Sequence, residues 1–255
     1  MERTKSNWQQ DQLKLWAQRA ATYNKLDWTT KSDFLKVFLN YCPVSPQAEV
    51  VDIGIGTGTV AEALAPHVKK VLGIDICPQM IAELKANPSH SHIDCYEADV
   101  QDMPFPANSF DLCTARMVFH HVENCMLGLS EVLRVLKPRG HLVFIEGVPP
   151  DHRTRKRYEE IFALKEKRHT FSEAELINMF HRTGFKHIAL FPYFMEQVSL
   201  NNWLNNSALP VATIAEIKRL HVEADDYFKQ VYNLKEVGGD VLMDWKFVIL
   251  IGEKG

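Results

Sequence analysis

The chain has 255 residues, of which 46% are hydrophobic and 24% are charged, and its net charge is −3. This composition is typical of a globular protein and excludes a disordered, collagen-like or low-complexity chain. The near-balanced charge gives no global basic field that would attract nucleic acid, so we expect no nucleic-acid partner.

No segment predicts targeting or membrane insertion. The first 20 residues lack the apolar stretch of a secretory signal, and no run approaches the ~20 apolar residues of a transmembrane helix. The cysteines are odd in number and spread out, without a C-x-x-C pair: Cys42, Cys77, Cys95, Cys113 and Cys125. Such a set favours reduced thiols in the cytoplasm over a disulfide framework or a zinc site. A catalytic cysteine stays open as an alternative.

Short apolar runs alternate with helical stretches through the first 150 residues. Residues 1–41 are predicted to be helical, and Pro43 and Pro46 then interrupt the chain. Strands are expected over 50–53, 70–74, 92–97, 110–115 and 141–146, with helices over 58–66, 78–86 and 126–136 between them. This alternation predicts βαβ units in an α/β protein with a doubly wound, mostly parallel sheet.

The rhythm changes after the fifth strand. Residues 152–168 form a charged helical stretch. The next helix is expected to start at Ser172, which forms a capping box with Glu175, and to end near Gly184. A strand over 186–191, a helical block over 199–233 and a final strand over 241–251 complete the chain.

A glycine-rich turn follows the first strand, in VVDIGIGTG. Its glycines let the backbone turn tightly and approach a ligand closely. The dinucleotide fingerprint G-x-G-x-x-G, counted from Gly54, needs a glycine at position 59, where this chain has Thr59. Asp52 would repel a pyrophosphate but suits a cationic amino group such as that of S-adenosylmethionine (SAM). The plainer alternative is a tight turn with an N-capping aspartate.

Two further acids come at strand ends. Asp75 ends the second strand, where a carboxylate can accept hydrogen bonds from both hydroxyls of a ribose. Asp99 ends the third strand and could accept from the amine of adenine, with Met80 packed on the base. Surface acids and a core methionine are the alternatives.

Four segments together resemble the class I SAM-dependent methyltransferases: VVDIGIGTGTVAEALA, VLGIDICPQMI, YEADVQDMPFPANSFDLCTARMVFHHV and EVLRVLKPRGHLVFIEG. The resemblance covers about residues 48–148 and resumes weakly at FSEAELINMFHRTGF. FHHV and RVLKPRG look most like the small-molecule branch, which includes the ubiquinone/menaquinone-biosynthesis C-methyltransferases. The resemblance implies a seven-stranded Rossmann-like sheet whose last strand is antiparallel.

The resemblance also implies SAM as methyl donor and S-adenosyl-L-homocysteine as product. Carried over by position, the SAM-binding residues are Tyr23, Asp52, Gly54, Gly56, Thr57, Asp75, Ile76, Met80, Asp99, Val100, Ala115 and Arg116. Arg116 departs from the family, in which smaller polar residues are frequent at this place. It would either recognise an acidic acceptor or pair with a neighbouring carboxylate.

Methyl transfer from a sulfonium mainly needs alignment of the nucleophile with the methyl carbon. A base is needed only if the acceptor must lose a proton. His120 and His121, just after the fourth strand, are the candidate bases, although packing roles are an alternative. His152 and His169 are weaker candidates. No metal site is predicted, because no ligand spacing supports one.

We predict one methyltransferase domain over 1–255, with helical cap elements at about 1–41, 151–170 and 199–238. Aromatic residues are concentrated in these additions. We expect some of them, Trp203 and Tyr193 first, to line a pocket for a small aromatic or hydrophobic acceptor. The others would enlarge the core.

Two other functions stay open. The basic run over residues 153–157 leaves room for an RNA or protein methyltransferase. A non-catalytic SAM-binding protein is the other alternative, because methyl transfer needs few indispensable groups whose absence would show it. The sequence gives no oligomeric state.

Overall fold

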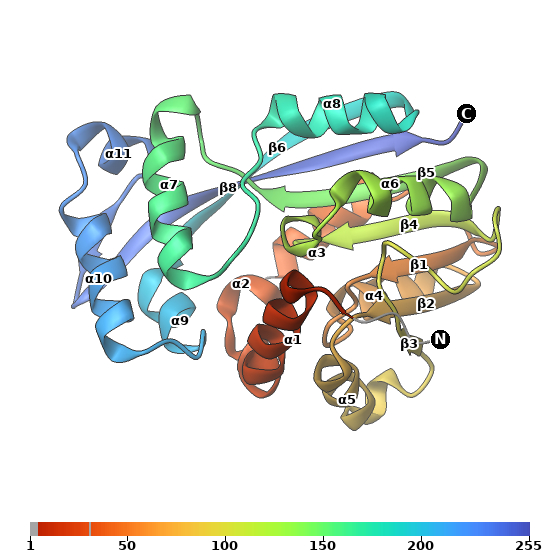
Figure 1. The fold of residues 1–255 in the computed structure, drawn as a ribbon, viewed down its shortest axis with the longest axis horizontal. Helices are drawn as coiled ribbons and strands as arrows, with labels where there is room; N and C mark the ends of the chain where they lie inside the picture. The colour runs from red at the N-terminus through yellow and green to blue at the C-terminus, as the bar shows by residue number, and fades with distance from the viewer. Residues whose placement is uncertain (1–4, 31) are drawn as a thin grey trace.

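The computed structural model describes residues 5–30 and 32–255, and within them one mixed sheet has the order β3-β2-β1-β4-β5-β8-β6, with β7 paired to β8 (Figure 1). The strands are β1 Glu49–Ile53, β2 Lys70–Asp75, β3 Asp94–Glu97, β4 Phe110–Arg116, β5 Leu136–Gly147, β6 Lys186–Ser199, β7 Lys235–Val237 and β8 Asp240–Glu253. β1 to β5 pair in parallel, and β8 is antiparallel to β5 and β6. The predicted doubly wound sheet with an antiparallel last strand is confirmed. The short β7 is an unpredicted eighth strand.

Alternating side chains along the central strands feed two separate cores. Val50 and Val143 pack on the face that carries α3 (Ser32–Tyr41) and α4 (Thr59–Leu64). Their neighbours Val51 and Phe144 point the other way, toward α6 (Cys125–Val135) and α8 (Glu173–Thr183). Strands buried on both faces have few polar positions, which explains the continuous apolar runs in the sequence.

The remaining helices are α1 Asn7–Arg19, α2 Asp27–Thr30, α5 Pro78–Ala86, α7 His152–Lys165, α9 Leu200–Asn205, α10 Val211–Val222 and α11 Asp226–Val231. Short 3₁₀ turns occupy η1 Ala20–Lys25, η2 Ala65–His67, η3 Pro88–His90 and η4 Phe119–His121. The predicted capping box of α8 is present, because Ser172 Oγ accepts from the Glu175 N–H at 3.3 Å. Gly184 ends that helix with a φ of 108°, as expected of a C-terminal glycine.

The outer strands are longer than predicted and carry the cap. β6 and β8 extend past the other strands, and α7, α9, α10 and α11 gather at their far end (Figure 1). The predicted helical element over 199–238 is therefore partly wrong, because residues 235–237 pair with β8 as a strand. The element over 151–170 is helical only to Lys165. None of the helices in the described residues has the length and apolar character needed to cross a membrane.

Candidate active site

The glycine loop after β1 takes a shape that only glycine adopts easily. Gly54, Gly56 and Gly58 all have positive φ, at 62°, 55° and 93°. A Cβ on Gly54 would lie 2.4 Å from Val118 Cγ2, so this position has no room for a side chain. The loop thus turns sharply at the carboxyl edge of the sheet, where doubly wound folds bind ligands.

Asp75 at the end of β2 holds this loop through backbone hydrogen bonds. Its Oδ2 accepts from the Gly56 N–H at 2.9 Å, and its Oδ1 accepts from the Cys77 N–H at 2.8 Å. Burial raises the pKa of Asp75 to about 6, although these backbone donors oppose the shift. A carboxylate has about four acceptor positions, so both oxygens keep capacity for the hydroxyls of a ligand.

A cavity of about 790 Å³ opens between the loop, α1 and α5. Nine of the predicted cofactor residues line it: Tyr23, Gly54, Gly56, Asp75, Ile76, Met80, Asp99, Val100 and Arg116. These residues come from five separate parts of the chain, and the parallel strands bring them to one edge. The Arg116 guanidinium donates to the Thr29 carbonyl at 3.0 Å, which ties the end of β4 to α2.

Three predicted cofactor residues lie outside the lining of this cavity. Asp52 is buried beneath the loop and accepts from Thr114 Oγ1 at 2.7 Å. Burial raises its pKa to about 7, against the effect of the Thr114 hydrogen bond. Thr57 donates to Asn24 Oδ1 at 2.6 Å, and Ala115 is buried in the sheet. The structure places Asp52 under the loop, and its contact with a cationic ligand stays a prediction.

Helix α1 closes the cavity from above, which the sequence did not predict in detail. Gln9 bridges two elements: its Oε1 accepts from the Ser6 N–H at 2.8 Å, and its Nε2 donates to Asp99 Oδ2 at 2.5 Å. Trp8 donates to the His121 carbonyl at 2.6 Å. Trp16 packs edge-on against His121, with ring centroids 5.0 Å apart. The start of α1 is thus bonded directly to the predicted ligand site.

A second cavity of about 930 Å³ lies against the first, beneath the cap. The two cavities share Trp16, Tyr23, Met117 and His121 in their linings. Trp203 lines the second cavity together with Tyr158, Phe162 and Trp245, and its contact with an acceptor stays a prediction. Tyr193 does not line it, and this prediction is corrected: it packs 4.9 Å from Phe34 in the core. On β6 it pairs with Phe247 of β8, and it is Phe247 whose side chain lines the cavity.

His120 reaches this cavity as half of a buried pair. Its Nδ1 lies 2.5 Å from Glu146 Oε2, and both side chains are almost fully buried. Burial holds the pKa of His120 well below its usual range and raises the pKa of Glu146 to about 7. When Glu146 is ionised it can only accept, so the hydrogen of neutral His120 lies on Nδ1 and its Nε2 carries the lone pair. Glu146 was missed, although its place at the end of β5 puts it on the same sheet edge.

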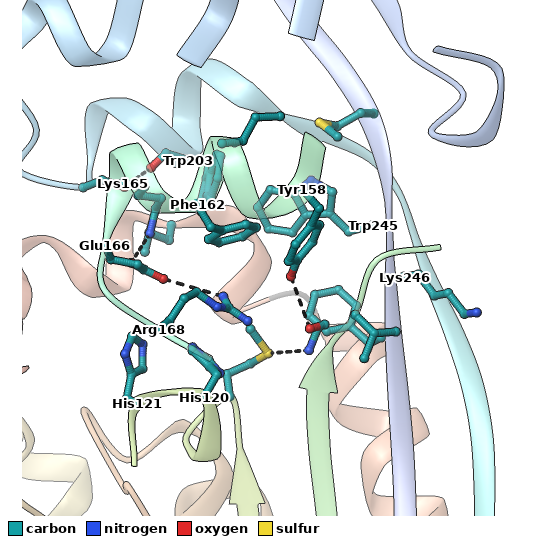
Figure 2. Close-up of a pocket in the computed structure, with 18 of the residues that line it drawn as sticks. His120, His121, Tyr158, Phe162, Lys165, Glu166, Arg168, Trp203, Trp245 and Lys246 are labelled. Carbon is teal, nitrogen blue, oxygen red and sulfur yellow. Dashed lines mark hydrogen bonds and ion pairs between the residues drawn. The ribbon is translucent and has the colours of Figure 1, made fainter. Parts of the chain in front are cut away.

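Four charged groups meet beside these histidines. Glu166 accepts from Arg19 and from Lys165, each at 2.5 Å, and Arg168 lies 3.6 Å away. Burial alone would raise the pKa of Glu166, but the surrounding cations hold it well below its usual range. Burial lowers the pKa of Lys165 to about 7, although Glu166 opposes the change. Figure 2 shows Glu166 and Arg168 between the aromatic side chains and the histidine pair.

The comparisons with known proteins agree with this geometry. A family model described as "Methyltransferase domain" matches residues 51–144. The chain carries a methyltransferase domain. That stretch holds most of β1, all of β2, β3 and β4, most of β5, the glycine loop, His120 and His121. The resemblance seen in the sequence is therefore confirmed.

The relatives and solved structures extend the same picture. A demethylmenaquinone methyltransferase of Deinococcus radiodurans is 39% identical over 106 residues, which are 40% of this chain and 44% of that protein. The aligned parts of the first curated relatives are half of their length or less. The structure of YcgJ from Bacillus subtilis superposes with a TM-score of 0.76 at 20% identity, over 86% of this chain and 97% of that one.

One further neighbour carries a ligand. A Haemonchus contortus phosphoethanolamine N-methyltransferase, solved with phosphomonomethylethanolamine and S-adenosylhomocysteine, has a TM-score of 0.64 at 16% identity. It covers 98% of this chain and 61% of that one. These likenesses establish the Rossmann-like methyltransferase fold. The superposition with the Haemonchus contortus enzyme, at 98% of this chain, also includes the cap.

Proposed function

We propose that this methyltransferase moves a methyl group from SAM to a small, flat and largely apolar acceptor. The observation that carries the proposal is the pair of abutting cavities, which share Trp16, Tyr23, Met117 and His121. One cavity offers strand-end acids and a glycine loop, and the other offers aromatic rings. Such a pair suits a donor and an acceptor that meet at the shared wall.

The residues of the first cavity fit SAM. Asp75 presents fixed carboxylate oxygens for a ribose diol, and Asp99 is held in place by Gln9 and Gln101 near the expected adenine. Met80 supplies an apolar wall and is only 3% exposed. At Gly56 a Cβ would meet nothing closer than 3.9 Å, so the missing side chain leaves room for a ligand beside the loop.

When bound, SAM supplies an electrophilic methyl group on a sulfonium. The residues of this chain then have to align the acceptor, exclude water and accept a proton if the acceptor carries one. Trp16 and Tyr23 pack edge-on with ring centroids 5.7 Å apart at the shared wall, and exclusion of water by these rings would strengthen electrostatic interactions inside. The unprotonated Nε2 of His120 is the base that we assign, with Glu146 fixing its tautomer.

Met117 sits at the joint between the cavities in a strained conformation. Its φ is 59°, and left-handed backbone costs a non-glycine residue about 1–2 kcal/mol. Its Sδ accepts from the Gly147 N–H at 3.1 Å, which holds the turn in place. The left-handed backbone at Met117 turns the chain after β4, so that Met117 lines both cavities.

The basic run over residues 153–157 gives no support to an RNA substrate. Arg155 is paired with Glu159 and Glu175, each at 2.8 Å. Arg153 stacks on the Tyr227 ring at 3.5 Å. Pairing of Arg155 with two carboxylates lowers the net positive charge that this surface run offers to a polyanion. The five cysteines, all free, agree with a cytoplasmic site for the reaction.

The test is an assay with methyl-labelled SAM and a fractionated extract of small metabolites. We expect label in a low-molecular-weight, organic-extractable product, and none in RNA or protein added in parallel. A His120→Gln variant controls for background transfer and should lose most of the signal. Label only in RNA or protein would contradict the proposal, and no transfer to any fraction would leave SAM binding without catalysis as the function.

A further inference from the structure

The second cavity holds a buried arginine whose guanidinium is only partly paired. Arg168 lies between α7 and α8, and its side chain is 3% exposed. Its Nε donates to the His169 carbonyl at 3.2 Å, whereas Nη1 lies 3.6 Å from Glu166, beyond hydrogen-bond reach. Nη2 is buried and has no partner among the described residues. Because an unpaired buried donor is costly, this arrangement indicates a ligand that supplies the acceptor.

Flat apolar side chains surround this guanidinium. Its centre lies 4.3 Å from the Phe162 ring and 5.9 Å from the Tyr158 ring. Phe162 packs edge-on to Trp203 at 5.4 Å, and Trp203 packs edge-on to Trp245 at 5.2 Å. Figure 2 shows these rings together on one side of the cavity. They would hold a flat apolar body while the guanidinium meets a polar group at its edge.

The charges that face Arg168 are mainly positive. Among the described residues that line this cavity, Glu166 is the only acid: Arg19 and Lys165 both bond to its Oε2 at 2.5 Å, and its Oε1 makes only the longer 3.6 Å ion pair with Arg168. The nearby Glu146 bonds to His120 instead. Arg168 therefore has no carboxylate of its own within hydrogen-bond distance.

We propose that Arg168 binds an anionic oxygen of the acceptor, either a carboxylate or a phenolate. This inference rests on the proposed methyl transfer and names the class of acceptor. Nη1 and Nη2 both lack a close acceptor, so the guanidinium can present its fork to the two oxygens of a carboxylate. A phenolate would use one of the two donors.

A divalent cation is the rival ligand here. His120, His121 and Glu166 each offer a donor atom, and these atoms lie within 4.8 Å of one another. A metal ion would, however, lie beside the cations that already surround Glu166. Repulsion between like charges in a buried site favours an anion over a metal at this place.

The experiment titrates the purified protein, saturated with S-adenosylhomocysteine, with three probes of one shape: 2-naphthoate, 2-naphthamide and 2-naphthol. Calorimetry gives each affinity. We expect naphthoate or naphthol to bind about 10- to 100-fold more tightly than naphthamide, because only the first two can present an anionic oxygen. Naphthoate that binds more tightly than both 2-naphthol and 2-naphthamide at one pH identifies a carboxylate site. Proton release on naphthol binding identifies a phenolate site.

The variant Arg168→Met should remove the preference, and Arg182→Met, an exposed arginine on α8, should keep it. If Arg168→Met does not fold, the affinities of the wild-type chain for the charged and neutral probes can still overturn the inference. Equal affinity for the charged and neutral probes, or no binding of any probe, with S-adenosylhomocysteine still bound, overturns this inference alone. Naphthoate binding that requires Zn²⁺ and is lost with a chelator also overturns it. Failure to bind S-adenosylhomocysteine overturns the proposed function instead.

Discussion

Replacement of Gly54 by alanine tests the link between the glycine loop and the rest of the site. The φ of 62° costs an alanine about 1–2 kcal/mol. The new Cβ would also lie 2.4 Å from Val118 Cγ2, and such overpacking adds about 1–3 kcal/mol. We therefore expect Gly54→Ala to lower the free energy of unfolding by about 2–5 kcal/mol, a large part of a typical total of about 5–15 kcal/mol.

Two further variants separate these terms in urea unfolding at 25 °C. Gly238 has a φ of 58° but nothing within 4 Å of its Cβ position, so Gly238→Ala carries only the backbone cost of about 1–2 kcal/mol. Val118→Ala removes the methyl groups that meet the new Cβ. The double variant Gly54→Ala/Val118→Ala should then be less destabilised than the sum of its single variants. A Gly54→Ala variant as stable as Gly238→Ala, or strict additivity with Val118→Ala, would refute the reasoning.

Three more predictions concern buried charges. Asp52→Asn should stabilise the protein at pH 8 but not at pH 4. Burial raises the pKa of Asp52 to about 7, so the folded protein loses stability relative to the unfolded chain as the pH rises from about 4 to 7, and asparagine avoids this loss. Thermal unfolding at pH 8 should show a gain of at most about 4 kcal/mol. Glu166→Gln should destabilise by about 3–5 kcal/mol in urea, because it leaves buried cations without their partner. The rate of methyl transfer should rise with pH around 7, where the pair of Glu146 and His120 loses its proton, and Glu146→Gln should remove that rise and lower kcat at least tenfold.

Each of these predictions has its own control. Asp111→Asn removes a half-buried acid whose pKa is lowered, so its pH response should have the opposite sign to that of Asp52→Asn. Glu159→Gln removes an exposed ion pair and should change stability by less than about 1 kcal/mol. For the rate profile, a Glu146→Gln variant that keeps both the wild-type kcat and its rise with pH would mean that the pair of Glu146 and His120 takes no part in the reaction.

The sheet and one half of the site could be predicted because they depend on local patterns. Strand-end residues of a parallel sheet reach one edge by topology, which places Asp75 and Asp99 together without any knowledge of side-chain contacts. Asp52 shows the limit of this argument. A position at a strand end does not give the direction of the side chain, and Asp52 turns to Thr114 beneath the loop.

The other half depends on contacts between residues far apart in the sequence. Gln9 reaches Asp99 across 90 positions, and Arg19 reaches Glu166 across 147. No periodicity or motif encodes such pairs, because each depends on how the cap docks on the sheet. The same holds for Tyr193, whose place on the extended β6 sends it to the core. Composition alone could predict an aromatic cap, but not which rings face the acceptor.

Binding of SAM is the most direct test of the account. Calorimetry on the wild-type chain should show SAM binding at one site, with no binding of NAD. Asp75→Asn should weaken SAM at least about 30-fold, because the carboxylate is assigned hydrogen bonds to the ribose that are worth about 1.5–3 kcal/mol each. Binding of NAD without SAM, or an unchanged SAM affinity in Asp75→Asn, would contradict the central claim.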